Sequence, residues 1–98
     1  MRDLAELTAA DFEGVAGSIF EVIGPGRELL AIRLADVILL PERPGPRRAF
    51  SLRFEGPHDR VLPQAVHRIR HRDMGDLEVF IGPIASGSTG ITYEAVFT

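Results

Sequence analysis

Apolar and polar residues alternate along six short stretches of the chain, and this period of two is typical of half-buried β-strands. In the second and longest stretch the alternation slips at residues 35–36. Its apolar residues occupy even positions from Leu30 to Leu34 and odd positions from Val37 to Leu39, which predicts a β-bulge or a corner between two strands. The six predicted strands cover residues 18–23, 27–40, 49–57, 66–72, 76–82 and 90–97.

A short helix is predicted before the first strand. Thr8 can serve as its N-cap, and Asp11 follows at the position from which its side chain can reach back in a capping box. Leu7 and Phe12 occupy the two positions of a hydrophobic staple, and Gly17 suits a left-handed exit from the helix. The helix has barely two turns, so its stability must come from packing against the rest of the protein.

Turn-forming residues separate the predicted strands, most clearly at 41–48, where three Pro and one Gly occur in eight residues. The expected fold is therefore mainly β: a small antiparallel six-stranded barrel or sandwich with one short N-terminal helix at about 8–16. We expect a single domain over residues 1–98. The residues expected to fill its interior include Phe50, Phe54, Ile69, Val79 and Phe97.

The stretch from residue 66 to residue 82 predicts a β-hairpin with two unlike faces. A three-residue loop at 73–75, with its glycine in the left-handed conformation, places Arg70 opposite Glu78. Directly opposed residues share a face, so this register separates apolar from charged side chains and opposes charges of unlike sign. The inner face is expected to carry His67, Ile69, His71, Leu77, Val79 and Ile81, and the outer face Arg68, Arg70, Arg72, Asp76, Glu78 and Phe80.

His67 and His71 raise the question of a metal site. On a strand they would lie about 13 Å apart, whereas the ligands of one zinc ion each lie about 2 Å from it. The chain has no Cys, so thiolate ligands are excluded. The sequence therefore predicts inward-facing histidines with hydrogen-bond partners, and neither a metal nor another cofactor.

Charge and composition exclude several classes of function. The formal net charge of −3 argues against a nucleic-acid partner held by phosphate neutralisation. No apolar run reaches the roughly 20 residues that span a bilayer, and no apolar segment of a signal peptide follows the charged first residues. We therefore expect no nucleic-acid or membrane partner, and a location in the cytoplasm or in a particle assembled there.

Catalytic chemistry finds little support in the sequence. The adjacent His58 and Asp59 lack a nucleophile setting such as Gly-x-Ser-x-Gly, and a polar loop explains them better. The chain is therefore expected not to be an enzyme.

The outer face of the 66–82 hairpin is the candidate interaction site. Phe80 and Val66 lie on it beside Arg68 and Arg70, and an aromatic residue flanked by arginines has the composition of a protein interface. The alternative is that the short helix covers this face and uses Phe80 as an internal contact, because a two-turn helix needs a docking site. The candidate protein-interface residues are Val66, Arg68, Arg70 and Phe80.

Several motifs give the chain a resemblance to an uncharacterised bacterial family of short single-domain proteins. They are "LTAADF" at 7–12, "FSLRFEGP" at 50–57, "LPQ" at 62–64, "GDLEVFIGP" at 75–83 and "YEAVF" at 93–97. The resemblance covers the whole chain and implies no activity and no catalytic residue. It carries an association with gene clusters for tail-collar or tail-fibre proteins of phage-like particles.

Two kinds of function remain in view. The first is a non-enzymatic protein-binding or structural module, such as an accessory component of a phage-tail-like assembly, whose partner is another protein or a second copy. The second is a small barrel that binds an apolar small molecule, which a cavity above about 300 Å³ would favour.

Overall fold

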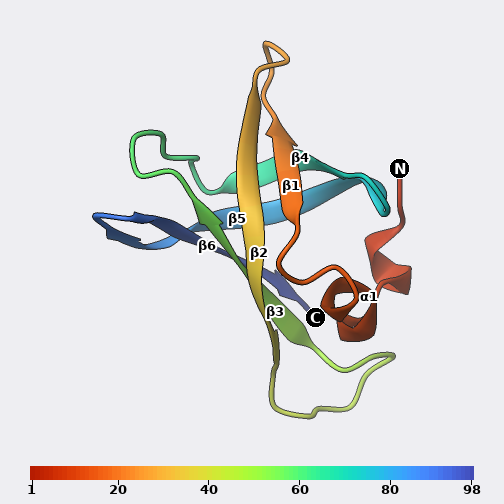
Figure 1. Ribbon diagram of the computed structural model, residues 1–98. Coiled ribbons are helices and arrows are strands. Elements are labelled where there is room, and N and C mark those ends of the chain that lie inside the picture. Colours follow the sequence, from red (N-terminus) through yellow and green to blue (C-terminus); the bar gives the residue numbers. More distant parts are fainter.

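Six antiparallel strands close into a barrel in the computed structural model, which describes all 98 residues (Figure 1). Around the barrel the order is β1-β2-β3-β6-β5-β4, and β4 pairs with β1 to complete the ring. The predicted mainly β fold with one short N-terminal helix is confirmed, and of the two architectures expected, barrel or sandwich, the chain forms the barrel. The strands are β1 (Ile19–Ile23), β2 (Leu29–Leu39), β3 (Phe50–Gly56), β4 (Ala65–His71), β5 (Gly75–Gly87) and β6 (Gly90–Phe97).

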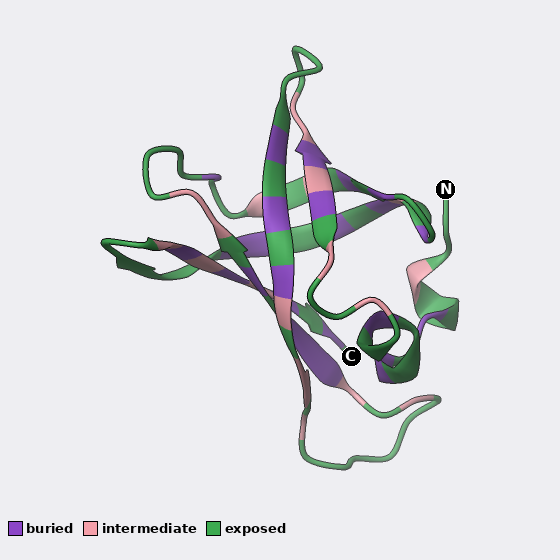
Figure 2. Cartoon of the chain, viewed as in Figure 1, coloured by how far each residue is buried: buried purple, intermediate pink, exposed green.

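The interior of the barrel is packed with side chains. Buried and exposed residues alternate along β2 in Figure 2, as a strand with one face on a core requires. Aromatic rings make up much of the packing: Phe20 meets Phe54 edge-on at 5.4 Å between ring centroids, and Phe50 stacks on Phe97 at 4.8 Å. The five residues predicted to fill the interior are all buried, namely Phe50, Phe54, Ile69, Val79 and Phe97.

The phase slip in β2 is a bulge. The pairing of β2 with β3 shifts between Leu34 and Asp36, as the sequence predicts. Val37 then packs against the core as expected, but Leu39 does not. Leu39 is 53% exposed because it lies at the very end of β2, next to the 40–49 loop.

A helix closes one end of the barrel. It is α1 (Ala9–Glu13), where the Thr8 amide donates to Asp11 Oδ2 at 2.8 Å in the predicted capping box. Helical geometry ends earlier than expected, and turns occupy the next residues up to Gly17, which has the left-handed φ of 85°. The Phe12 ring packs 5.8 Å from that of Phe50 and 5.3 Å from that of Phe97. A 3-10 turn, η1 (Leu4–Glu6), precedes α1 and was not predicted.

Arg47 joins three distant parts of the chain at this end of the barrel. Its Nη1 donates to the carbonyls of Leu4, at 2.6 Å, and Leu7, while its Nε donates to the carbonyl of Thr98 at 3.2 Å. The guanidinium carbon also lies 5.5 Å from the ring centroid of Phe50, within the range of a cation–π interaction. The loop between β2 and β3 is thereby held against both ends of the chain.

The register of the β4–β5 hairpin differs from the prediction. His71 pairs with Gly75, so the loop begins one residue earlier than expected and each β4 residue faces a β5 residue two positions earlier. Arg70 therefore faces Asp76, and the predicted pairing of Arg70 with Glu78 is wrong. A shift of two residues keeps every side chain on its predicted face.

Burial of the loop explains this register. Met74, predicted to lie in the three-residue loop at 73–75, is 6% exposed and belongs to the core cluster. His71 accepts a hydrogen bond at Nδ1 from the Asp73 amide at 3.0 Å, which folds the loop back over the histidine. Gly75 does adopt the predicted left-handed conformation, with φ of 77°.

Candidate functional site

Val66 and Phe80 face each other across β4 and β5 on the outside of the barrel. Val66 is 62% exposed and Phe80 is 56% exposed. The reading in which the helix covers Phe80 is therefore wrong, because α1 packs at the barrel end on Phe50 and Phe97 instead. Two directly opposed apolar side chains, one aliphatic and one aromatic, are therefore in contact with solvent.

A single carboxylate holds both arginines beside this pair. Arg68 donates from Nε and Nη2 to Asp76 Oδ2, at 3.2 and 2.8 Å, and Arg70 donates from Nε to Oδ1 at 3.1 Å. Hydrogen bonds from Arg70, and then from Arg68, hold the pKa of Asp76 below its ordinary value. The hydrogen bond to Asp76 likewise raises the pKa of Arg70. Both guanidiniums are thus bonded to the same carboxylate.

Both ring nitrogens of His71 are engaged in hydrogen bonds. Nε2 lies 2.7 Å from Ser18 Oγ, and the Ser18 hydroxyl donates to the carbonyl of Val15. Since Nδ1 accepts from the Asp73 amide, the proton of the ring lies on Nε2 and is donated to Ser18. The histidine connects the β4–β5 loop to the segment between α1 and β1.

His67 lies near the other end of β4 and is half-buried. Its Nε2 bonds the carbonyl of Pro63 at 2.7 Å. His67 and His71 thus each have their own partner, and no group of three or more potential metal ligands comes together anywhere in the chain.

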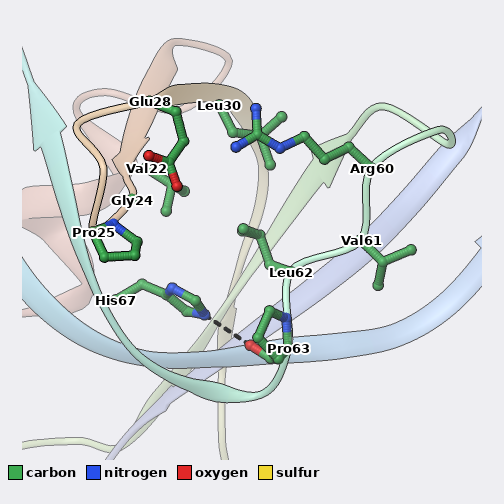
Figure 3. A pocket seen from close by; sticks show the side chains of 10 residues that line it. All are labelled: Val22, Gly24, Pro25, Glu28, Leu30, Arg60, Val61, Leu62, Pro63 and His67. Carbon is green, nitrogen blue, oxygen red and sulfur yellow. Dashed lines mark hydrogen bonds between the residues drawn. The ribbon is translucent and has the colours of Figure 1, made fainter.

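A small pocket lies at the end of the barrel opposite α1 (Figure 3). Its volume is about 250 Å³, and buried apolar side chains of Val22, Leu30 and Leu62 contribute to its lining. Glu28 and Arg60 extend over it from opposite sides in Figure 3. The remaining lining residues are Gly24, Pro25, Val61, Pro63 and His67.

Tyr93 fixes the loop that forms one wall of this pocket. The Leu62 amide donates to the Tyr93 hydroxyl oxygen at 2.9 Å, and that hydroxyl donates to the Arg60 carbonyl at 3.4 Å. The tyrosine ring is fully buried while its hydroxyl is bonded to this loop, an arrangement common for buried tyrosines.

A second hollow, of about 480 Å³, lies on the outer face next to the two arginines. The β1–β2 hairpin supplies residues that were not among the predicted interface positions. The alternation of the sequence could have identified two of them. Ile23 and Leu29 are next to the core residues Val22 and Leu30 in the chain, so their side chains point to the opposite, outer face. The hollow is lined by Ile23, Arg27, Leu29, Arg68 and Arg70.

No helix of the protein has the length and apolar character needed to cross a membrane.

Comparison with known proteins places this barrel in a family. The family described as a domain of unknown function (DUF6916) matches residues 7–97, which include α1 and all six strands. No curated protein and no solved structure matches the chain significantly. The expectation of an uncharacterised family is confirmed at this level. The chain is a member of the DUF6916 family of domains of unknown function.

Proposed function

We propose that this domain is a non-enzymatic protein-binding module whose interface includes Val66, Arg68, Arg70 and Phe80. The observation that carries the proposal is the directly opposed pair of Val66 and Phe80, each more than half exposed. Single exposed apolar residues are ordinary on protein surfaces. Here a valine lies directly opposite a phenylalanine with arginines beside them, and Phe and Arg are among the residue types enriched at protein interfaces.

The arginines strengthen the proposal because Asp76 restrains them before any partner arrives. Immobilising a long side chain on binding costs about 0.5–1.5 kcal/mol. A guanidinium that is already held by a carboxylate loses less freedom on association. The closed barrel likewise presents the face on paired strands rather than on loops.

The resemblance to chains associated with phage-tail-like gene clusters supports a setting for this module. In that setting it is an accessory component of a phage-tail-like assembly, in the cytoplasm or in a particle assembled there. Its partner is another protein of the assembly or a second copy of the chain.

Binding of an apolar small molecule is the second candidate, and the pocket in Figure 3 favours it. We rank it lower because the barrel interior is filled by large side chains, including Phe20, Phe54 and Tyr93. The pocket volume of about 250 Å³ is also below the roughly 300 Å³ of ordinary ligand sites.

Site-specific photocrosslinking tests the protein-binding function. A benzophenone amino acid replaces Phe80 in one variant and Leu39 in a matched control, since both side chains are apolar, on strands and more than half exposed. Leu39 lies on β2, three strands around the barrel from β5.

Irradiation in the native cells should give a crosslinked protein for position 80 and none for position 39. Adding Val66→Ser to the position-80 variant should reduce the yield. Equal crosslinking from both positions, or none from position 80, would refute the proposal.

A further inference from the structure

The outer hollow next to Arg68 and Arg70 extends the proposed interface over four adjacent strands. Ile23 of β1 pairs with Leu29 of β2 on one side and with Arg68 of β4 on the other. These three residues form one outward row, which Glu78 of β5 continues. Val66 lies two residues before Arg68 on the same face of β4. The hollow thus adjoins the Val66–Phe80 pair on the same face of the sheet.

Guanidinium groups line the hollow. Three of its five lining residues are arginines and none is acidic. Arg68 and Arg70 share the one carboxylate of Asp76, and Arg27 forms no ion pair. Glu21 faces Arg70 and Glu78 faces Arg68, so the three guanidiniums are balanced by three carboxylates on this face. The hollow therefore offers guanidinium groups rather than a net positive charge.

Several guanidinium donors point to no partner within the protein. Arg68 bonds Asp76 through Nε and Nη2, which leaves its Nη1 group unused, and Arg70 bonds only through Nε, which leaves both Nη groups. Arg27 makes no side-chain hydrogen bond. Such donors are suited to carboxylates, which a guanidinium can bind through two parallel bonds.

The backbone at Arg27 supports a role for its side chain. Arg27 is the only residue other than glycine with positive φ, at 64°. Non-glycine residues cost free energy in this left-handed region, and a glycine would fit the turn without that cost. The conformation is held by the Arg27 amide, which donates to the Gly24 carbonyl at 2.9 Å.

We propose that this hollow receives an acidic protein segment, which places an apolar side chain on Ile23 and Leu29 and its carboxylates against Arg27, Arg68 and Arg70. This inference rests on the proposed protein-binding function and names the chemistry of the partner. The arginines favour a ligand with carboxylates, and Ile23 and Leu29 favour one with an apolar side chain.

Acidic residues on the same face argue for a protein segment rather than a continuous polyanion. Glu21 faces Arg70 across β1 and β4, and Glu78 faces Arg68 across β4 and β5. The whole chain carries a net charge of −3. A nucleic acid or an anionic membrane would meet these carboxylates along its length, whereas a short acidic segment contacts only the hollow.

Fluorescence anisotropy with designed peptides tests the inference. The probe is a labelled nine-residue peptide, Gly-Ser-Glu-Glu-Leu-Glu-Glu-Ser-Gly. A second peptide carries Lys in place of every Glu, and a third carries Ser in place of Leu. The protein variants are Arg27→Ala, Arg70→Ala and Leu29→Ser, each checked by circular dichroism. Arg33→Ala is the matched control, since Arg33 is also an exposed arginine but lies on β2 and pairs with Glu55 outside the hollow.

The glutamate peptide should bind the unaltered protein, and each of the three variants should weaken binding at least tenfold, whereas Arg33→Ala should not. Replacing Leu by Ser should also weaken binding, and the lysine peptide should not bind. The inference is overturned by equal binding of the lysine peptide, by no effect of Arg27→Ala, or by no binding at all.

Two other occupants are tested with the same variants. Tighter binding of a 20-nucleotide DNA strand would assign the hollow to nucleic acid, and a dimer that Arg27→Ala dissociates in sedimentation would assign it to a second copy of the chain. Either result also overturns the inference. If the photocrosslink at position 80 forms while the peptide fails, the protein-binding function stands without this partner chemistry.

Discussion

Replacing Arg47 tests how the β2–β3 loop and the two ends of the chain are held together at the barrel end that α1 closes. Its side chain joins the β2–β3 loop to the carbonyls of Leu4, Leu7 and Thr98, and it lies against the rings of Phe50 and Phe97. Arg47→Ala removes all of these contacts at once. We expect a clear loss of stability without any change in the strands.

The magnitude follows from the individual contacts. A hydrogen bond from a charged donor contributes about 1.5–3 kcal/mol, but the Leu4 carbonyl keeps its bond from the Leu7 amide, and water can reach the Thr98 carbonyl. A cation–π contact at a partly exposed site adds about 0.5–1 kcal/mol. Because contacts of one side chain are not additive, we expect a total of about 2–3 kcal/mol, from the bond to Leu7 and the ring contacts. For a domain of this size that lowers Tm by about 8–24 °C.

Thermal unfolding followed by circular dichroism measures this loss. Arg48→Ala is the control, since the neighbouring Arg48 is exposed and makes one hydrogen bond, from Nε to the Leu40 carbonyl at 2.8 Å. It should change stability by no more than about 0.5 kcal/mol. Arg47→Lys, which keeps the charge but not the planar donors, should fall between the two. If Arg47→Ala melts at the same temperature as Arg48→Ala, Arg47 does not hold the chain ends as described.

Three further predictions concern the outer face and its support. Phe80→Ser should lower the free energy of unfolding by about 0.5 kcal/mol or less, because Phe80 is 56% exposed. Phe12→Ser, at a buried position of α1, should lower it by about 3 kcal/mol or more. Equal melting temperatures of the two variants would contradict the placement of the helix. His71→Leu leaves the Asp73 amide unpaired and should cost about 1–3 kcal/mol in urea unfolding, while His67→Leu, which removes one bond at a half-buried site, should cost less. The carboxyl of Asp76 should titrate by NMR below the ordinary value of about 3.9, since Arg70 and Arg68 lower its pKa. The stabilisation by this cluster is therefore present above the ordinary pKa and is lost as the pH falls through the lowered pKa, and titration at the ordinary value in the folded protein would disprove the shared carboxylate.

The sequence by itself determined the elements and their faces. Alternation with period two placed Leu30, Ile32 and Leu34 inside and identified the bulge after Leu34, because side chains on a strand point to opposite faces in turn. The outward position of Phe80 followed from the same rule. It survived a wrong register because a shift of two residues does not exchange the faces. The start of α1 was equally local, since a capping box involves only Thr8 and Asp11.

Tertiary structure alone decided which of these elements meet. The β4–β5 register depends on the burial of Met74 and on the bond from the Asp73 amide to His71, whose other nitrogen is held by Ser18 from beyond the hairpin. Charge pairing within the hairpin could not reveal that Asp76 takes both Arg68 and Arg70, because long arginine side chains reach diagonal as well as direct partners.

Closure of the barrel decided the rest of the candidate site. Ile23, Arg27 and Leu29 join Arg68 and Arg70 only because β1 pairs with β4, two strands more than forty residues apart in the chain. Arg47 reaches Thr98 because β3 pairs with β6, where Phe50 lies opposite Phe97. Local patterns report which way each side chain points, whereas contacts between distant segments depend on how all six strands share a single core.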